Sequence, residues 1–391
     1  MSKNITVGID IGSYSTRVMV VEHTQEKGRN FSKIIGVGKS TSKGMHHGYI
    51  VNIGDASESL EEAITQAESQ SGIRIRQALV SVNGIELSSH AQQGSSIISR
   101  ADNEVSDLDV QKSTDDAESK LQIPNKEIID FIPIEYKLDG QKILGRPQGM
   151  KGIKLDSKIL FLACSKQHIE NIIKTVNQAG IDVLDMIPGP LAASLVTTTE
   201  RQRTAGCALL DIGSDTVSLS VFEDGTLSSL KVFGIGSSDI TNDIAIGLRI
   251  SLDEAEEIKK GILIDRDISQ EKVEEIIEAR LTDIFEYTKT HLKKIKRDGL
   301  LPAGVIIVGA GSIIPITEHL ARNILQLPAT KAVHSSGKKN SILEQEEWFV
   351  TYGLCMAGKY QTTKNNTLNP FKKITKTVSG FLKSIIKQIM P

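Results

Sequence analysis

The sequence predicts an α/β protein made of two similar halves with a ligand cleft between them. The first observation is a repeat, because Asp-Ile-Gly-Ser occurs at 10–13 and again at 211–214. The second is its context, since each copy ends an apolar segment and precedes a run of β-forming residues. The third is the alternation of strand-like and helix-like segments between and after the two copies. Together they indicate the internal duplication of a whole domain.

Length and charge limit the function classes. A chain of 391 residues exceeds the usual size of one domain, and 39% hydrophobic residues are enough to form buried cores. The net charge of −2 does not fit a strongly basic nucleic-acid-binding protein. No stretch approaches the roughly 20 apolar residues of a membrane-spanning helix.

In the first part of the chain, strands are expected at 5–11, 17–21 and 78–82, with a helix at 57–71. Residues 84–163 are expected to form an inserted module. Its expected elements are strands near 97–98, at 128–136 and at 158–163, a polar helix near 108–121, and a glycine-rich loop at 145–152. A helix at 166–178 follows, and Gly180 stops it.

In the second part, strands are expected at 207–212, 216–222 and 305–308. A short helix is expected at 252–260, a long one at 271–297 and another ending near 325. The long helix is acidic first and basic last, which suits the helix dipole.

These elements divide the chain into segments. The predicted segments are a first half at 1–83 and 164–195, the inserted module at 84–163, a second half at 196–240 and 300–360, a subdomain inserted in the second half at 241–299, a polar linker at 361–370, and a C-terminal helix at 371–391.

The repeated turn has a chemistry suited to phosphates. Glycine allows the backbone to approach a ligand closely, and successive backbone N–H groups in such a turn form an anion-binding concavity. The serine adds a donor, and an aspartate at the end of a strand can hold Mg²⁺ through its water shell. A third glycine turn, at 308–312, opens a predicted helix. One such turn alone is most often an ordinary hairpin, so the order of the three predicts a polyphosphate cleft.

The C-terminal segment has the pattern of an amphipathic helix. At about 100° per residue its apolar side chains fall on one face and its lysines on the other, with no acidic residue between them. The apolar face holds Phe371, Ile374, Val378, Phe381, Leu382, Ile385, Ile386 and Ile389, and the opposite face holds Lys372, Lys373, Lys376, Lys383 and Lys387. This pattern predicts a helix lying in the plane of an anionic membrane. A helix that packs on the protein body or on a partner is the alternative.

The motifs resemble those of a known superfamily. Residues 10–17, 211–216 and 308–312 are similar to the three nucleotide motifs of the actin/Hsp70/sugar-kinase superfamily. Within it, the intervening sequence resembles the FtsA family of bacterial cell-division proteins. The similar stretches are 48–52, 132–136, 139–141, 149–152, 190–194 and 240–245. The likeness covers nearly the whole chain, and an insertion after residue 84 is typical of that family.

The resemblance implies a fold and a function. The fold would be actin-like (ribonuclease H-like), duplicated, with a nucleotide cleft and the FtsA-type inserted subdomain. The protein would bind ATP and Mg²⁺, form actin-like filaments, and attach to anionic lipids through its tail. It would work at the division site on the cytoplasmic face of the cell membrane, where it would recruit the tubulin-like protein FtsZ and other division proteins. No nucleic-acid partner is implied.

The resemblance also assigns residues. Asp10 and Asp211 would face the metal ion. The nucleotide would contact Gly12, Ser13, Tyr14, Ser15, Arg17, Gly213, Ser214, Asp215, Thr216, Gly236, Asn242, Glu256, Lys259, Gly309, Gly311 and Ser312. The FtsZ peptide would meet the helix at 271–297, with Arg280, Lys289 and Lys293 as candidates. An ordinary solvated helix face is the alternative for these three.

The second phosphate turn departs from the family pattern. Ser214 and Asp215 replace two glycines, and Ser218 stands where an aspartate is common. A serine cannot orient a water molecule as a carboxylate does, so we expect slow or negligible ATP hydrolysis, with ATP as a structural ligand. The rival interpretations are a small-molecule kinase of the same superfamily and a pilus-type cytoplasmic scaffold of similar fold.

Overall fold

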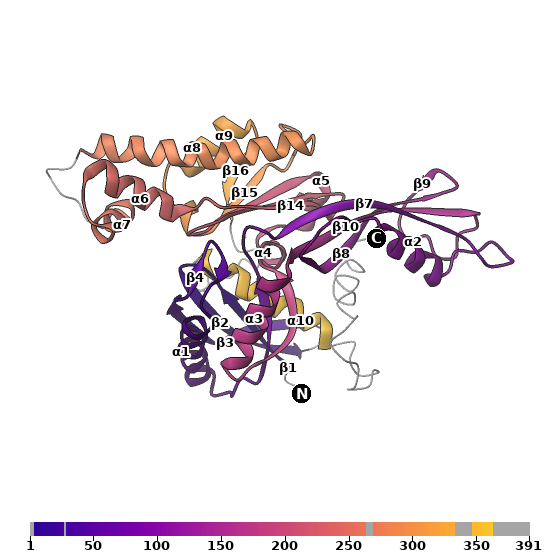
Figure 1. Ribbon diagram of the computed structural model, residues 1–391, viewed down its shortest axis with the longest axis horizontal. Coiled ribbons are helices and arrows are strands. Elements are labelled where there is room, and N and C mark those ends of the chain that lie inside the picture. The colour runs from indigo at the N-terminus through magenta and orange to yellow at the C-terminus, as the bar shows by residue number, and fades with distance from the viewer. Residues whose placement is uncertain (1–3, 27–28, 263–268, 333–345, 363–391) are drawn as a thin grey trace.

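The computed structural model describes residues 4–26, 29–262, 269–332 and 346–362. The chain is built around a five-stranded sheet in the order β11-β6-β1-β2-β3 and a nine-stranded sheet in the order β16-β15-β12-β13-β14-β7-β10-β8-β9 (Figure 1). A small hairpin of β4 (Met45–His46) and β5 (Tyr49–Ile50) stands apart from both sheets.

The first half consists of the five-stranded sheet and its helices. β1 pairs antiparallel with β2, which pairs antiparallel with β3, while β6 lies parallel to β1 and to β11. The strands are β1 (Asn4–Ile11), β2 (Ser15–Glu26), β3 (Arg29–Thr41), β6 (Gln77–Val82) and β11 (Asp182–Pro188), and the helices are α1 (Ile53–Ser71) and α3 (Lys166–Gln178). α1 begins at Asn52, whose side chain accepts two backbone N–H groups, and it ends at the left-handed Gly72.

The second half repeats this arrangement. β12 pairs antiparallel with β13 and β13 with β14, while β15 lies parallel to β12 and to β16. These strands are β12 (Cys207–Ile212), β13 (Val217–Glu223), β14 (Thr226–Phe233), β15 (Val305–Val308) and β16 (Ala329–Lys331). The order and the directions match those of the first sheet, so the predicted duplication is confirmed.

The helices of the second half are α5 (Glu200–Ala205), α6 (Ser237–Leu248), α7 (Leu252–Lys259), α8 (Gln270–Lys294) and α9 (Thr317–Leu325). In Figure 1, α8 and α9 lie on the side of the second sheet that faces away from the first half, and α6 and α7 lie at one end of this half. α8 buries Leu281, Ile284 and Phe285 completely. It ends before Arg297, the expected last residue, and Lys296 already takes a left-handed conformation with φ 59°.

The glycine turn after β15 differs from the expectation. It opens a short 3₁₀ helix (Ala310–Ile313), and α9 begins only at Thr317. Pro315 accounts for the interruption, because a residue before proline is driven out of the helical region and Ile314 is extended with φ −60° and ψ 125°. This turn therefore does not lie directly at the N-terminus of an α-helix.

The inserted module follows a strand of the first half in the chain, but its own strands are hydrogen-bonded to the sheet of the second half. It consists of β7 (Ser88–Ile97), α2 (Asp107–Ser119), β8 (Lys126–Leu138), β9 (Gln141–Ile143) and β10 (Lys154–Ser165). β7 pairs antiparallel with β14, where Lys231 is opposite Ser88, so the module extends the second sheet (Figure 1). The strand expected near 97–98 is the end of a longer, largely polar strand.

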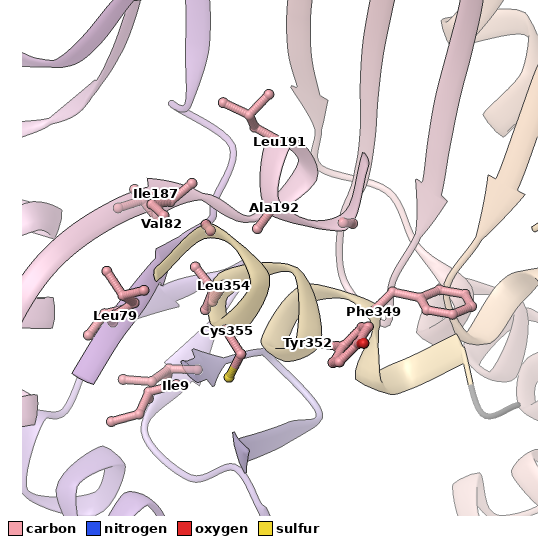
Figure 2. Packing of buried hydrophobic residues seen from close by; sticks show 14 of the residues in the cluster. Ile9, Leu79, Val82, Ile187, Leu191, Ala192, Phe349, Tyr352, Leu354 and Cys355 are labelled. Atoms are coloured by element: carbon pink, nitrogen blue, oxygen red, sulfur yellow. The ribbon is translucent and has the colours of Figure 1, made fainter. Parts of the chain in front are cut away.

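Two helices lie between the sheets. α4 (Gly189–Thr197) and α10 (Phe349–Thr362) contact each other, and α10 packs its Leu354 and Cys355 toward Ile9 and Leu79 of the first sheet (Figure 2). The approach is close, because a Cβ on Gly353 would lie 2.0 Å from the Ala192 carbonyl oxygen. Residues 349–360, which the sequence pattern places in the second half, pack on the sheet of the first half.

α10 also includes residues 361 and 362, the first two of the predicted linker. The rest of that linker and the predicted helix at 371–391 lie outside the described residues. Among the helices that the structure describes, none is both long and apolar enough to cross a membrane.

Candidate functional site

A cavity of about 960 Å³ lies between the two halves. Asp10 and Asp211 both line it, and so do residues of α6, α7 and the turn after β15. The volume is at the upper end of the roughly 300–1,000 Å³ typical of small-molecule sites. The duplication thus brings the two repeated motifs to one cavity.

The two repeated turns have the same backbone hydrogen bond. The Gly12 N–H donates to the Ser15 carbonyl at 3.2 Å, and the Gly213 N–H donates to the Thr216 carbonyl at 2.9 Å. Each turn joins the first two strands of its sheet, and residues 12–15 and 213–216 all line the cavity. Two equivalent turns therefore approach one ligand space from opposite halves.

Asp10 is fixed by a set of donors. Its Oδ1 accepts from Ser81 Oγ at 2.6 Å and from Asn83 Nδ2 at 2.9 Å. Its Oδ2 accepts from Arg17 Nη1 at 3.2 Å, and Arg17 is also the residue opposite Asp10 in the β1–β2 register. The carboxylate is thus held in one orientation and has a cationic partner.

Asp211 occupies the equivalent position, but among the described residues it has no such cationic partner. The residue opposite it in the β12–β13 register is Ser218. Burial and the nearby Asp10 charge raise the pKa of Asp211 to about 6, while Arg17 opposes this shift. A carboxylate in this setting gains from a cation placed beside it.

The described side chains do not form a complete metal site by themselves. Among the described residues, no group of three or more His, Cys, Asp or Glu side chains is arranged to hold a metal ion. Mg²⁺ on a nucleotide commonly needs only one or two carboxylates, because waters and phosphates complete its shell. Asp10 and Asp211 fit that requirement.

Two buried polar atoms of the first turn have no hydrogen-bond partner in the described structure. They are Ser15 Oγ and Arg17 Nε. The nearest acid to this Nε is Glu347, whose Oε2 lies 3.8 Å away and also 2.6 Å from Lys39 Nζ. A buried donor without a partner is costly unless a ligand completes it. An anionic oxygen in the cavity would complete both.

On the opposite wall, α6 and α7 hold a compact polar cluster. Lys259 Nζ donates to the Ser237 carbonyl at 3.0 Å and to Thr241 Oγ1 at 2.8 Å, and it lies 2.6 Å from Glu256 Oε2. Burial lowers the pKa of Lys259, and the Glu256 carboxylate counteracts that shift. The one-turn spacing of Glu256 and Lys259 on α7 places both side chains at the cavity.

Comparison with known proteins decides the family. A family model described as Cell division protein FtsA matches residues 208–357, and one described as the SHS2 domain inserted in FTSA matches residues 84–163. Cell division protein FtsA of Bacillus subtilis (strain 168) is 31% identical over 347 residues, which cover 83% of this chain and 78% of the relative. This chain belongs to the FtsA family. The FtsA of Pseudomonas aeruginosa is 28% identical over 380 residues, covering 90% of each chain.

Solved structures agree on the fold of this FtsA-family chain. A chain of the PilM-PilN type IV pilus biogenesis complex covers 90% of it, with a TM-score of 0.67 and 16% identity, and 98% of that chain is matched. MreB5 of Spiroplasma citri bound to ADP covers 92%, with a TM-score of 0.53 and 12% identity, and 97% of that chain is matched. At such identities the likeness shows the fold alone, and that fold is actin-like, as expected.

Asp215, the acid in the second turn of this FtsA-family chain, accepts hydrogen bonds on both of its carboxylate oxygens. Its Oδ1 accepts from the hydroxyls of Ser214 at 2.9 Å and Ser238 at 3.0 Å. Its Oδ2 accepts from the His47 backbone N–H at 3.3 Å. The Asp215 carboxylate is therefore hydrogen-bonded by donors from both halves, because His47 belongs to the first half.

Some residues assigned to the nucleotide lie behind the cavity wall instead. Gly236, Gly311 and Ser312 do not line the cavity, whereas the other assigned residues do. A Cβ on Gly236 would lie 2.0 Å from the Ser214 carbonyl oxygen, and one on Gly311 would lie 2.3 Å from Ile212 Cγ2. These glycines let the backbone of the wall pack closely, and Ser312 is fully buried.

Sequence reasoning missed several cavity residues. Lys39, Asn83 and Glu347 come from β3, the turn after β6 and the segment before α10, and no local motif marks them. Lys260 follows the assigned Lys259 and could have been found, since it is four residues after Glu256 and contacts Glu256 Oε1 at 3.1 Å. Its Nζ lies 5.8 Å from the ring centre of Tyr14 in the other half.

The residues assigned to the FtsZ peptide all lie on α8, but they differ in setting. Arg280 Nε donates to Asp243 Oδ2 at 2.6 Å and Nη2 donates to Asp243 Oδ1 at 3.0 Å, which ties α8 to α6. Lys289 is partly buried and Lys293 is exposed. Arg280 is thus engaged within the protein, and Lys293 is the most accessible of the three.

Proposed function

We propose that this FtsA-family chain binds ATP with Mg²⁺ in the cleft and assembles into actin-like filaments on the cytoplasmic face of the cell membrane. There it tethers FtsZ filaments at the division site through its C-terminal amphipathic helix. The observation that supports nucleotide binding most strongly is the pair of equivalent turns, one from each half, that line a single cavity. MreB5 of Spiroplasma citri, which shares the fold, was solved with ADP and with AMPPNP.

Different residues would contact different parts of the nucleotide. Asp10 and Asp211 would hold Mg²⁺, which when bound neutralises phosphate charge. The two turns would donate to the phosphates, and Ser15 Oγ and Arg17 Nε have unused donors for them. Glu256 and Lys259 would face the nucleoside from α7. The ligand would then touch both halves, so its binding would favour the closed cleft.

Hydrolysis is proposed to be slow. A general base must reach the attacking water and accept its proton. The position opposite Asp211 holds Ser218, whose hydroxyl cannot do this. Asp215, Glu256 and Glu347 also line the cavity, but each already accepts hydrogen bonds or ion pairs from the protein.

Equilibrium binding of a fluorescent ATP analogue tests the cleft. We expect binding that weakens when EDTA removes Mg²⁺ and when Asp211 is changed to Asn, while Asp253→Asn at the cavity rim has little effect. Single-turnover release of phosphate should be slow with and without lipid. Rapid phosphorylation of sugars or polyols would instead favour the kinase, and absence of nucleotide binding would favour the scaffold.

Membrane attachment is argued from the sequence of residues 371–391. The lysine face would contribute about 1 kcal/mol for each lysine near an anionic surface, and the apolar face adds burial. Many tails on one filament would bind more firmly through avidity. In a vesicle-pelleting assay, Ile385→Asp with Ile386→Asp should abolish binding, while Gln388→Asp should weaken it only slightly. Pelleting that survives the double substitution would contradict the proposal.

The FtsZ interaction is assigned to the basic end of α8. An acidic peptide would be attracted to Lys289 and Lys293. We expect Lys289→Glu with Lys293→Glu to weaken binding of the FtsZ C-terminal peptide by about tenfold, on the scale of about 1.4 kcal/mol. Lys151→Glu with Lys158→Glu in the inserted module, which changes the net charge by the same amount, is the matched control. Equal effects of both changes would mean that net charge, and not this face, governs binding.

A further inference from the structure

Three lysines converge where the inserted module joins the second sheet. Lys231 lies on β14, directly opposite Ser88 of β7, at the strand pairing that links the two parts. Lys126, at the start of β8, donates from Nζ to Ser88 Oγ at 3.0 Å and to the Glu86 carbonyl at 2.9 Å. Lys294, the last residue of α8, lies one turn after His291, whose Nε2 is 2.9 Å from Ser229 Oγ of β14. We call these three residues the lysine joint.

The surrounding groups are hydrogen-bond donors and aromatic rings. His90 Nε2 lies 3.0 Å from Ser88 Oγ, and His291 Nε2 lies 2.9 Å from Ser229 Oγ. His291 also meets the ring of Phe233 edge-on at 6.2 Å. Ser229, Lys231 and Phe233 alternate along β14, so they share the face of the sheet that α8 approaches. The joint is therefore built from β7, β8, β14 and α8.

The positive charge of the joint is not compensated within the described part of the chain. Lys126, Lys231 and Lys294 form no ion pair there. Glu86 is exposed and offers Lys126 its backbone carbonyl, and strand alternation turns Glu127 to the other face of β8. Burial, followed by the charges of Lys126 and Lys294, lowers the pKa of Lys231. Among the described residues, no carboxylate forms an ion pair with any of these three like charges.

The two histidines do not add to this charge near neutral pH. Burial, together with Lys231 and Lys294, lowers the pKa of His291 to about 4, and burial with Lys126 and Lys231 lowers that of His90. Both rings are therefore neutral at pH 7 and can each offer one N–H. They add donors at the joint but leave the lysines as its source of attraction.

We propose that the lysine joint is a binding site for a phosphate-bearing anion, separate from the nucleotide cleft. Several ammonium groups with adjacent hydroxyl and imidazole donors suit an oxyanion with more than one charge better than a single carboxylate. Such an anion would relieve the repulsion between Lys126 of the module and Lys231 of the second half. Its binding would consequently stabilise the β7–β14 pairing and hold the module to that half.

Inorganic pyrophosphate titrated into the full chain is the first probe. We compare the unchanged chain, a joint variant with Lys126→Gln, Lys231→Gln and Lys294→Gln, and a control with Lys151→Gln, Lys158→Gln and Lys174→Gln. The cleft is the same in all three, so its own affinity for pyrophosphate cancels. We expect the joint variant alone to lose about tenfold or more in affinity, in keeping with several charge-assisted hydrogen bonds. Equal affinities in all three chains would exclude a site for soluble phosphates, and together with equal binding to lipid vesicles they would overturn the proposal.

Hydrogen exchange controls for misfolding of the variant, and vesicle pelleting identifies the source of the phosphate group. Pyrophosphate should slow hydrogen exchange of β7 and β14 in the unchanged chain and in the control, but not in the joint variant. Lys294→Gln alone changes an exposed position and should give an intermediate response. Pelleting with phosphatidic acid vesicles, whose head group is a phosphomonoester, then separates lipid head groups from soluble phosphates. A joint-specific loss only with vesicles assigns the site to lipid head groups, and a loss only with pyrophosphate assigns it to soluble phosphates. If the joint variant binds both pyrophosphate and vesicles as well as the control does, the proposed site is contradicted.

Discussion

The backbone N–H of His47 in the first half donates to Asp215 Oδ2 in the second half at 3.3 Å. The next residue of the same turn, Gly48, donates its N–H to Ser13 Oγ at 2.9 Å. The turn at 47–48 thus contacts both repeated turns, and Asp215 supplies the link across the cleft. Asp215 therefore forms a hydrogen bond that joins the two halves across the cavity.

Asp215→Ala should therefore loosen the cleft even without ligand. The loss of a hydrogen bond to a charged group costs roughly 1.5–3 kcal/mol, so the closed state should open more often. Hydrogen exchange at residues 44–50 should become faster, and a fluorescent ATP analogue should dissociate about tenfold faster or more. Asp253→Ala, which also lines the cavity, is the control. Unchanged exchange at 44–50 would refute the link, whatever happens to ATP binding.

Asp211→Asn should stabilise the ligand-free chain at pH 7 while it weakens Mg²⁺-dependent binding. Burial and Asp10 raise the pKa of Asp211 to about 6, so ionising this carboxyl in the folded chain is unfavourable. Removing the charge should increase the free energy of unfolding by roughly 1–3 kcal/mol, from about 1.4 kcal/mol for each pKa unit. Urea unfolding measures this effect. A less stable variant would mean that the charged Asp211 has a partner in the folded protein.

Acid should destabilise the fold in a defined pH window. Burial lowers the pKa of His168 to about 4, although its hydrogen bond to the Asn83 carbonyl at 3.1 Å opposes the shift. The unfolded chain takes up this proton near pH 6.5, whereas the folded chain does so near pH 4. Stability is therefore full above about pH 6.5 and falls as the pH drops toward 4.

His168→Gln should flatten this dependence, because glutamine does not titrate. The urea midpoint would be measured between pH 7 and pH 4 for both chains, with His319→Gln on the exposed side of α9 as the control. His23 should leave a remaining slope, since burial and the Lys359 charge lower its pKa to about 4 as well. Identical slopes for all three chains would rule out His168 as a contributor.

Gly353→Ala should destabilise the layer between the sheets. Its Cβ would lie 2.0 Å from the Ala192 carbonyl oxygen, so α4 and α10 would have to move apart. Overpacking of this kind typically costs about 1–3 kcal/mol. Gly54→Ala in the first turn of α1 is the matched control, where a Cβ meets only Asn52 Oδ1 at 3.4 Å. Denaturant midpoints should fall for the first change and stay or rise for the second.

Local pattern was sufficient for many elements. β15 and α3 have the predicted bounds, because their apolar periods and flanking signals are short-range. The two Asp-Ile-Gly-Ser turns could be recognised for the same reason, and their repetition predicted the duplicated fold. The cavity residues Lys39, Asn83 and Glu347 could not be recognised in this way, because only the folding of distant segments brings them to the cleft.

The sequence by itself determined that the chain has two equivalent halves with an Asp-Ile-Gly-Ser turn in each, since a tight glycine turn at the end of a strand is a short-range feature. Tertiary structure decided how these turns differ. Strand register placed Arg17 beside Asp10 but only Ser218 beside Asp211, and folding brought His47 to Asp215. It also joined the inserted module to the second half through Lys231 and Ser88. Charge and hydrogen-bond partners depend on distances in space, which local sequence patterns do not contain.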